Sequence, residues 1–197
     1  MPIEAELKAR VRDTPALLAA LDTRAKGESA LYRDHYFDSP DGSFAAAGHE
    51  LRIRTVETHD STRHILTYKA PAVDQTSGSK PEHETRVADP DAAIAIVRGL
   101  GYRTQIAFTK HCRNYSLHEH GRDLLATVVT VPEIDGTFIE VETIIPAEDD
   151  LPAALETVRS VLVSLGIHEA DLTDELYTDA VAHALAPTTE NRNETAR

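Results

Sequence analysis

Ile3-Glu4-Ala5-Glu6-Leu7-Lys8-Ala9-Arg10, close to the start of the chain, alternates apolar and charged residues. Successive side chains of a β-strand point to opposite faces, so a strand here would have one apolar face and one charged face. The charged face would carry two carboxylates followed by two cations. Such a line of charges suits a cation held beside a polyanion, although a solvated face of an antiparallel strand shows the same alternation.

The same alternation recurs in four later segments of the chain. They are Leu51-Arg52-Ile53-Arg54, Ile65-Leu66-Thr67-Tyr68-Lys69, Lys80-Pro81-Glu82-His83-Glu84-Thr85-Arg86 and Phe138-Ile139-Glu140-Val141-Glu142. Charged faces of mixed sign on several strands favour a closed barrel, in which the charged faces converge inside and the apolar faces meet helices outside. The predicted fold class is therefore α+β, an antiparallel β-barrel with helices packed outside.

Turn and capping signals divide the chain into further elements. Asp13-Thr14-Pro15 and Asp89-Pro90-Asp91 are typical of helix starts. We expect strands at 3–10, 30–37, 49–57, 63–69, 82–88, 105–117, 123–131 and 136–145, and helices at 15–25, 92–100, 151–165 and 173–185. The polar segment 74–79 is predicted to be a mobile loop. One domain is expected over 1–186, followed by a disordered tail at 187–197.

Composition limits the classes of function. At 197 residues the chain is expected to form one domain, and its net charge of −13 argues against a nucleic-acid-binding surface. It does not exclude an anionic substrate, because nearby cations set the local potential of a cleft. The one cysteine, Cys112, excludes an internal disulfide and fits a reducing compartment. Without a long apolar run or a signal-peptide pattern, we expect a cytoplasmic protein with no membrane partner.

The carboxylates on these faces are candidate metal ligands. Carboxylate oxygens are hard ligands that suit Mg²⁺ or Mn²⁺, and Mg²⁺ usually also contacts substrate phosphates. The candidates for metal binding are Glu4, Glu6, Glu140 and Glu142, with Glu82 and Glu84 as further ones. Packed this closely, like charges raise one another's pKa unless a metal ion or a basic residue compensates.

The basic residues of the same faces are candidate phosphate ligands, because arginine grips phosphate with its fork and lysine acts as a point charge. The set comprises Lys8, Arg10, Arg52, Arg54, Lys69, Lys80, Arg86, Lys110 and Arg113. Four of them, Lys8, Arg52, Arg54 and Lys69, are the candidates for a catalytic role. Cations and carboxylates together predict a metal-bound polyphosphate substrate.

The ordered motifs resemble the CYTH superfamily, the triphosphate tunnel metalloenzymes. The resemblance rests on Glu4-x-Glu6-x-Lys8, Asp34-x-Tyr36-Phe37-Asp38-Ser39-Pro40, Leu51-Arg52-Ile53-Arg54, Leu66-Thr67-Tyr68-Lys69, Glu82-x-Glu84 and Phe138-x-Glu140-x-Glu142. The Leu-Thr-Tyr-Lys block and the Tyr-Phe-Asp-Ser-Pro turn are closer to the class IV adenylate cyclases than to the thiamine triphosphatases. The resemblance implies an eight-stranded tunnel, glutamates that bind Mg²⁺ or Mn²⁺, and basic residues that grip a triphosphate. A homodimer is common in that family.

Two departures from the family pattern stand out. In the sixth strand, Cys112 occupies the place of an expected arginine. Arg113 could replace that arginine through a bulge, although a shift of one residue would turn it to the other face. The penultimate strand lacks the aspartate that usually binds metal near its end, and Thr130 is taken as the corresponding position.

Three functions remain open from the sequence. The leading hypothesis is a metal-dependent cyclase that converts ATP to cyclic AMP and pyrophosphate. The second is a triphosphatase acting on inorganic, nucleoside or thiamine triphosphate. The third is a divergent tunnel protein that binds or converts another phosphorylated metabolite, which the two departures favour.

Overall fold

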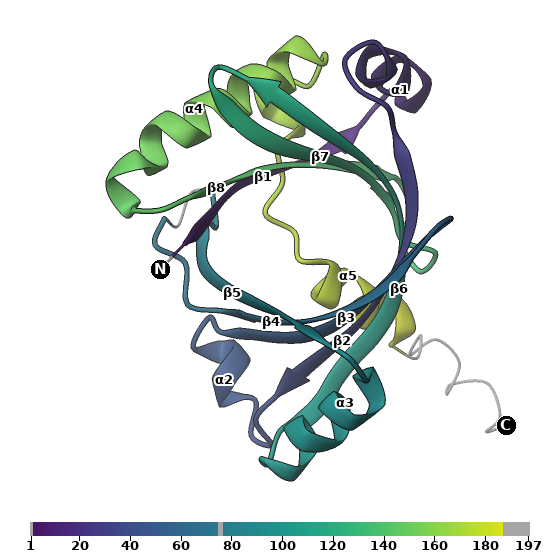
Figure 1. Ribbon diagram of the computed structural model, residues 1–197, viewed down its shortest axis with the longest axis vertical. Coiled ribbons are helices and arrows are strands. Elements are labelled where there is room, and N and C mark those ends of the chain that lie inside the picture. Colours follow the sequence, from purple (N-terminus) through teal and green to yellow (C-terminus); the bar gives the residue numbers. More distant parts are fainter. Residues whose placement is uncertain (1, 75–76, 187–197) are drawn as a thin grey trace, which may run out of the picture.

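The computed structural model describes residues 2–74 and 77–186, and within these its eight strands form a closed antiparallel barrel (Figure 1). Around the barrel the strands follow the order β1-β5-β4-β3-β2-β6-β7-β8. Their bounds are β1 Ile3–Val11, β2 Glu28–Asp38, β3 Glu50–Thr58, β4 Thr62–Lys69, β5 Lys80–Val87, β6 Arg103–Glu119, β7 Arg122–Thr130 and β8 Thr137–Ile145. The predicted barrel, its antiparallel pairing and its strand number are confirmed.

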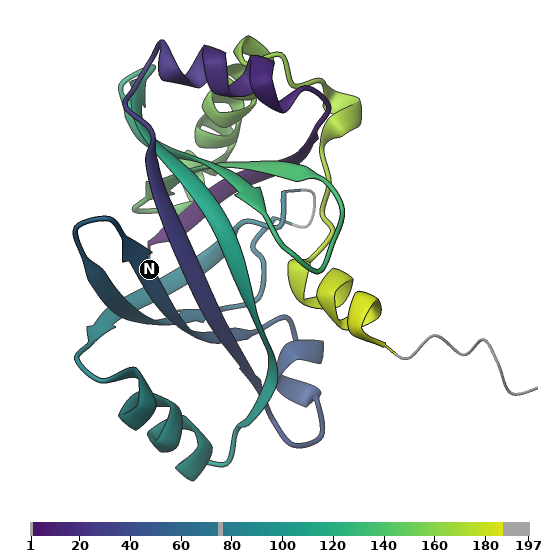
Figure 2. The ribbon, with the colours of Figure 1, turned by 90° about the vertical axis from the view of Figure 1, so that its right-hand side faces the viewer.

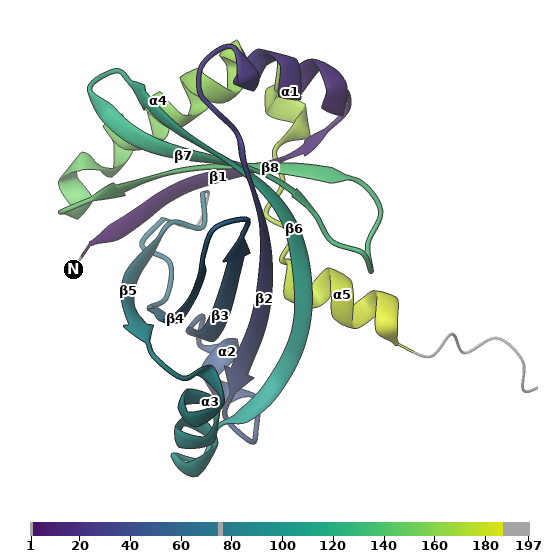
Figure 3. The same cartoon turned by 45° about the vertical axis from the view of Figure 1, so that its right-hand side comes forward.

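Most of the helices pack against the outside of the barrel wall, and the last helix lies at one end of the barrel (Figure 1, Figure 3). They are α1 Thr14–Asp22, α2 Ser43–Ala46, α3 Pro90–Gly99, α4 Leu151–Ser164 and α5 Tyr177–Leu185. Asp13 caps α1 and Asp89 caps α3 with its side chain, each followed by a proline in the first turn, as the sequence predicts. In Figure 1, α1 and α4 cover β7, β1 and β8, whereas α2 and α3 lie against the opposite wall.

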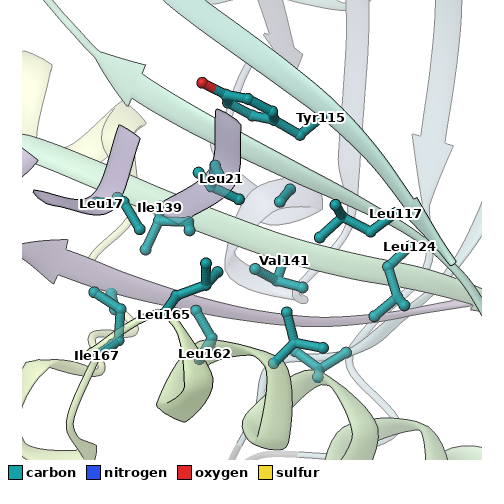
Figure 4. Close-up of a cluster of buried hydrophobic side chains, with 14 of the residues drawn as sticks. Leu17, Leu21, Tyr115, Leu117, Leu124, Ile139, Val141, Leu162, Leu165 and Ile167 are labelled. Carbon is teal, nitrogen blue, oxygen red and sulfur yellow. The ribbon is translucent and has the colours of Figure 1, made fainter. Parts of the chain in front are cut away.

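The largest part of the core lies between the barrel wall and the helices (Figure 4). The largest cluster joins outward residues of β1, β6, β7 and β8 to α1 and α4. Ile139 and Val141 of β8 are fully buried there, together with Val161 and Leu162 of α4. Because side chains alternate along each strand, packing the apolar face against helices leaves the charged face inside the barrel.

The barrel closes through one short seam between β1 and β5. Only Ile3↔Pro81 and Glu4↔Lys80 pair the two strands, whereas β1 pairs with β8 along its whole length. Beyond Glu4, the free edge of β1 meets the segment that precedes α5. The amide of Thr173 donates to the carbonyl of Lys8 at 2.9 Å, and Leu172 forms a bridge with Ala9.

This pairing explains the main error in the predicted elements. The last helix begins at Tyr177 rather than at residue 173, because the residues before it run extended along β1. Figure 3 shows α5 beside β6 and β2, at the end of that extended segment. The predicted tail at 187–197 lies outside the described residues, as does part of the predicted loop at 74–79. Within the described residues, no helix is long and apolar enough to cross a membrane.

The packing of α4 predicts a large loss of stability when one of its buried residues is truncated. Leu162 is 1% exposed, and its neighbour Val163 is 59% exposed. Leu162→Ala should lower the free energy of unfolding by about 2–4 kcal/mol, since it leaves a cavity in a close-packed core. Val163→Ala is the matched control and should change it by less than about 0.5 kcal/mol. Urea denaturation measures both, and similar losses would contradict the assigned packing.

Candidate functional site

The interior of the barrel holds a cavity of about 370 Å³, lined mainly by charged side chains. Nine charged residues that the alternation directs inward line it: Glu4, Glu6, Arg52, Arg54, Lys69, Glu82, Glu84, Glu140 and Glu142. Lys8, Lys80 and Lys110 line it as well. Residues spread over most of the sequence therefore share one cavity, as the charged strand faces predict.

Three carboxylates form a compact group on β1 and β8. Ligand atoms of Glu4, Glu6 and Glu142 lie within 4.8 Å of one another. The strand register explains this proximity, because Glu6 lies directly opposite Glu142 and Glu4 follows on the same face of β1. Three oxygen donors at this spacing are the kind of set that a hard divalent cation takes.

The electrostatics of the three carboxylates agree with that donor set. Burial raises the pKa of Glu6 to about 7, and the neighbouring Glu140 and Glu4 add to the rise. Burial also raises the pKa of Glu142 well above its ordinary value, with Glu4 and Glu6 adding to it. The pKa of Glu4 is raised as well, because burial outweighs the opposing charge of Lys69. The group is therefore short of positive charge, which a bound cation would supply.

The other candidate metal ligands are already paired with protein groups. The ammonium of Lys69 lies 2.9 Å from Glu82 and also contacts Glu4. Glu84 accepts a hydrogen bond of 2.8 Å from the hydroxyl of Thr67. Burial would raise the pKa of Glu140, but Lys110, at 3.5 Å, and Lys8 hold it below the ordinary value. None of these three belongs to the compact group.

The cavity's arginines are fixed by acids and by a tyrosine. Arg54 donates to both oxygens of Asp34 at 2.6 Å, a bidentate pair in which Asp34 is fully buried. Burial alone would raise the pKa of Asp34. The charge and the hydrogen bonds of Arg54 outweigh burial and hold this pKa far below its ordinary value. Arg52 donates to the hydroxyl of Tyr36 at 3.4 Å and lies 3.6 Å from Glu50. Both guanidinium groups are thus held in place without a ligand.

Three predicted phosphate ligands do not line the cavity. Arg10 is held 2.5 Å from Glu175 and lies over the ring of Phe138. Arg86 is exposed at the far end of β5. Arg113 points outward and donates to Asp22 of α1 at 2.8 Å. The bulge that would turn Arg113 inward is absent, since β6 keeps continuous register with β2 and β7 on both sides of it.

Both family departures have a defined place in the barrel. Cys112 faces inward but is buried among apolar residues, and burial raises the pKa of its thiol to about 12. Thr130, taken from the sequence as the position of the missing aspartate, is exposed, so that interpretation is wrong. The inward residues of β7 beside the glutamates are Leu125, opposite Glu142, and Thr127, opposite Glu140. The described part of β7 therefore places no acid beside the carboxylate group.

Several residues of the cavity are not among the predicted site residues. Arg63 lines it from β4, on the same face as Lys69, so the alternation that selected Lys69 could have found it. Asp34 and Glu50 occur in or beside the quoted motifs and hold the arginines. Tyr177 lines the cavity from the first turn of α5, and no strand pattern could have placed a helical residue there.

The interior of the barrel therefore brings acids and bases together around one cavity, and three of the acids form a set that could hold a metal ion. The CYTH domain family matches residues 2–177, and the chain belongs to this family. It is 30% identical over 179 residues to the adenylate cyclase CyaB of Aeromonas hydrophila, covering 88% of this chain and 86% of that protein.

Solved structures share the fold. A Pyrococcus horikoshii protein matches with a TM-score of 0.80 at 24% identity, covering 91% of this chain and 98% of the other. A Hippeastrum protein with a dominant triphosphatase activity matches with a TM-score of 0.63 at 18% identity, covering 93% and 96%.

The raised carboxylate pKa values predict that metal binding strengthens with pH. Protons compete with a metal ion for these oxygens, so Glu6, with a pKa of about 7, is mostly protonated at pH 6 and mostly ionised at pH 8. Calorimetric titration with Mn²⁺ should therefore give about tenfold tighter binding at pH 8 than at pH 6. Glu6→Gln should reduce this dependence, and the exposed Glu156→Gln on α4 should preserve it. Equal affinity at both pH values in the unaltered protein would contradict the assignment.

Proposed function

We propose that this chain is a metal-dependent enzyme that acts on a triphosphate, with conversion of ATP to cyclic AMP and pyrophosphate as the leading reaction. The observation that carries the proposal is that one cavity holds both a carboxylate group able to bind a cation and basic side chains able to bind phosphate. The compact carboxylate group lies on β1 and β8, whereas Arg52 and Arg54 come from β3 across the barrel (Figure 1). Lys69 of β4 reaches the group and contacts Glu4. The 30% identity to the Aeromonas adenylate cyclase supports the same reaction.

The protein groups fit a bound triphosphate with its cation. Glu4, Glu6 and Glu142 would hold Mg²⁺ or Mn²⁺, for which carboxylate oxygens are suitable donors. When bound, the ion would neutralise charge on the phosphate oxygens. Arg52 and Arg54 are held by acids within the protein, so little side-chain entropy is lost when they bind phosphate. Lys8, Lys69 and Lys80 add point charges along the cavity.

In the cyclase reaction, the 3′-oxygen of the ribose bonds to the α-phosphorus and its proton is released. The bond between the α-phosphorus and the bridging oxygen breaks, and pyrophosphate leaves with the electron pair. The residues of this chain would orient the triphosphate for that displacement and stabilise the charge that develops on pyrophosphate. The site must therefore supply positive charge near the β- and γ-phosphates.

A triphosphatase is the second candidate, because the same charges would hold a triphosphate for attack by water on the terminal phosphorus. The fold shared with the Hippeastrum triphosphatase supports it. Two features favour a divergent reaction. β7 has no acid beside the glutamates of β8, and Cys112 lies among apolar residues inside the barrel. The homodimer suggested by the family resemblance stays a prediction.

Phosphate binding should depend on inward arginines and not on outward ones. Arg52→Gln should weaken binding of inorganic tripolyphosphate by about 1.5–3 kcal/mol, the usual scale of a charged hydrogen bond. Arg113→Gln removes the same charge from the outer face and is the matched control. Calorimetry measures both affinities, and circular dichroism verifies that each variant folds. Equal weakening by the two substitutions would show that only net charge matters.

The reaction itself is tested by its products. With ATP and Mg²⁺ or Mn²⁺, the protein should form cyclic AMP and pyrophosphate in equal amounts, resolved by chromatography. Glu6→Gln should lower turnover at least about tenfold, and Glu156→Gln on the outer face of α4 should leave it unchanged. Release of phosphate without cyclic AMP would establish the triphosphatase instead. No product from ATP or tripolyphosphate would leave the divergent reaction.

A further inference from the structure

Tyr177 of α5 has a polar side chain that lies among the charges of the cavity. It is the first residue of the helix, and the extended segment before it is tied to β1 through Leu172 and Thr173. This attachment brings α5 against one end of the barrel (Figure 2). The ring of Tyr177 packs edge-on against the ring of Phe138 of β8, with the ring centroids 5.3 Å apart. Tyr177 is buried, with 6% of its surface exposed.

Two cations of the cavity lie against this ring. The ammonium of Lys8 is 4.7 Å from the ring centroid and that of Lys110 is 4.0 Å from it. Lys8 belongs to β1 and Lys110 to β6, so the ring holds together two strands that are not neighbours in the barrel. The carbonyl of Glu175 also accepts a hydrogen bond from Lys8. Any anion that the two lysines attract would therefore arrive beside Tyr177.

The hydroxyl of Tyr177 is buried and makes no hydrogen bond of normal geometry within the described residues, although the carboxylate of Glu140 lies close to it. Buried hydroxyls are almost always paired, because leaving one unpaired costs free energy. Burial and the charge of Glu140 raise the pKa of Tyr177, so the hydroxyl keeps its proton and remains a donor. The acceptor beside it is the carboxylate of Glu140, which Lys110, at 3.5 Å, and Lys8 already hold. A phosphate oxygen bound by the same two lysines would offer the hydroxyl a second acceptor.

We propose that Tyr177 is a substrate-binding residue, whose hydroxyl donates a hydrogen bond to a phosphate oxygen held by Lys8 and Lys110. The proposal rests on the proposed function, since it takes the ligand of the cavity to be a polyphosphate. The C-terminal segment then contributes to the site. Because residues 172 and 173 pair with β1, the hydroxyl of Tyr177 reaches the cavity from outside the barrel strands.

The test compares tripolyphosphate binding by three proteins in the absence of metal. Tyr177→Phe keeps the ring, its contact with Phe138 and both cation contacts, and removes only the hydroxyl. It should weaken binding about tenfold, the lower end for a hydrogen bond to a charged group. Its melting temperature should stay equal or rise, because the lost hydroxyl makes no hydrogen bond of normal geometry within the described residues. Tyr102→Phe is the control, since Tyr102 packs on Phe44 outside the barrel and lies outside the cavity lining.

The outcomes separate this proposal from the function on which it rests. If the unaltered protein binds no tripolyphosphate under any metal condition, both fail. If it binds and Tyr177→Phe binds within twofold of it, Tyr177 is only a packing residue and the proposal is overturned. A melting temperature lowered by several degrees in Tyr177→Phe would likewise assign the hydroxyl to stability. Weaker binding with unchanged melting supports the proposal.

Discussion

The structure depends on pairing buried charges inside the barrel. Glu4 and Glu82 share the ammonium of Lys69, and Arg54 is matched to Asp34 by two hydrogen bonds. Removing charged groups from water is costly unless each finds a partner with good geometry. The interior of this barrel meets that demand in most places, so its cations are held in place around the cavity. Most of the apolar core lies outside the wall, and a second apolar cluster that includes Cys112 fills part of the interior. The charged cavity occupies the remaining interior and is available for ligand chemistry.

The pairing is incomplete at the group formed by Glu4, Glu6 and Glu142. Lys69 partly compensates Glu4, but its charge does not offset the burial and mutual repulsion of the three carboxylates. Such an arrangement is unfavourable for folding and favourable for cation binding. Lys110 and Lys8 already balance Glu140, which separates it from the compact group despite its similar position in the sequence pattern. The cavity thus has one defined region that is deficient in positive charge.

The seam between β1 and β5 gives the C-terminal segment its place. With two residue pairs joining these strands, the rest of that edge of β1 is open to another partner. Exposed strand edges are normally paired or covered. Leu172 and Thr173 take that role here, and α5 then reaches the end of the tunnel. A local feature of strand pairing therefore decides which helix borders the cavity.

The sequence by itself determined the barrel and most of the cavity, because a side-chain period of two shows which residues share a face of a strand. It could not distinguish a residue that lines the cavity from one beyond its end: Arg10 and Arg86 have the correct phase but lie outside. It also could not fix the register between distant strands, which decides that Glu6 meets Glu142 and that Thr127, not Thr130, faces Glu140. Only the tertiary structure placed Tyr177, since that position depends on pairing between residues more than 160 apart in the chain, such as Ala9 and Leu172. Such long-range pairing depends on closure of the whole barrel, whereas the alternation of each strand is local.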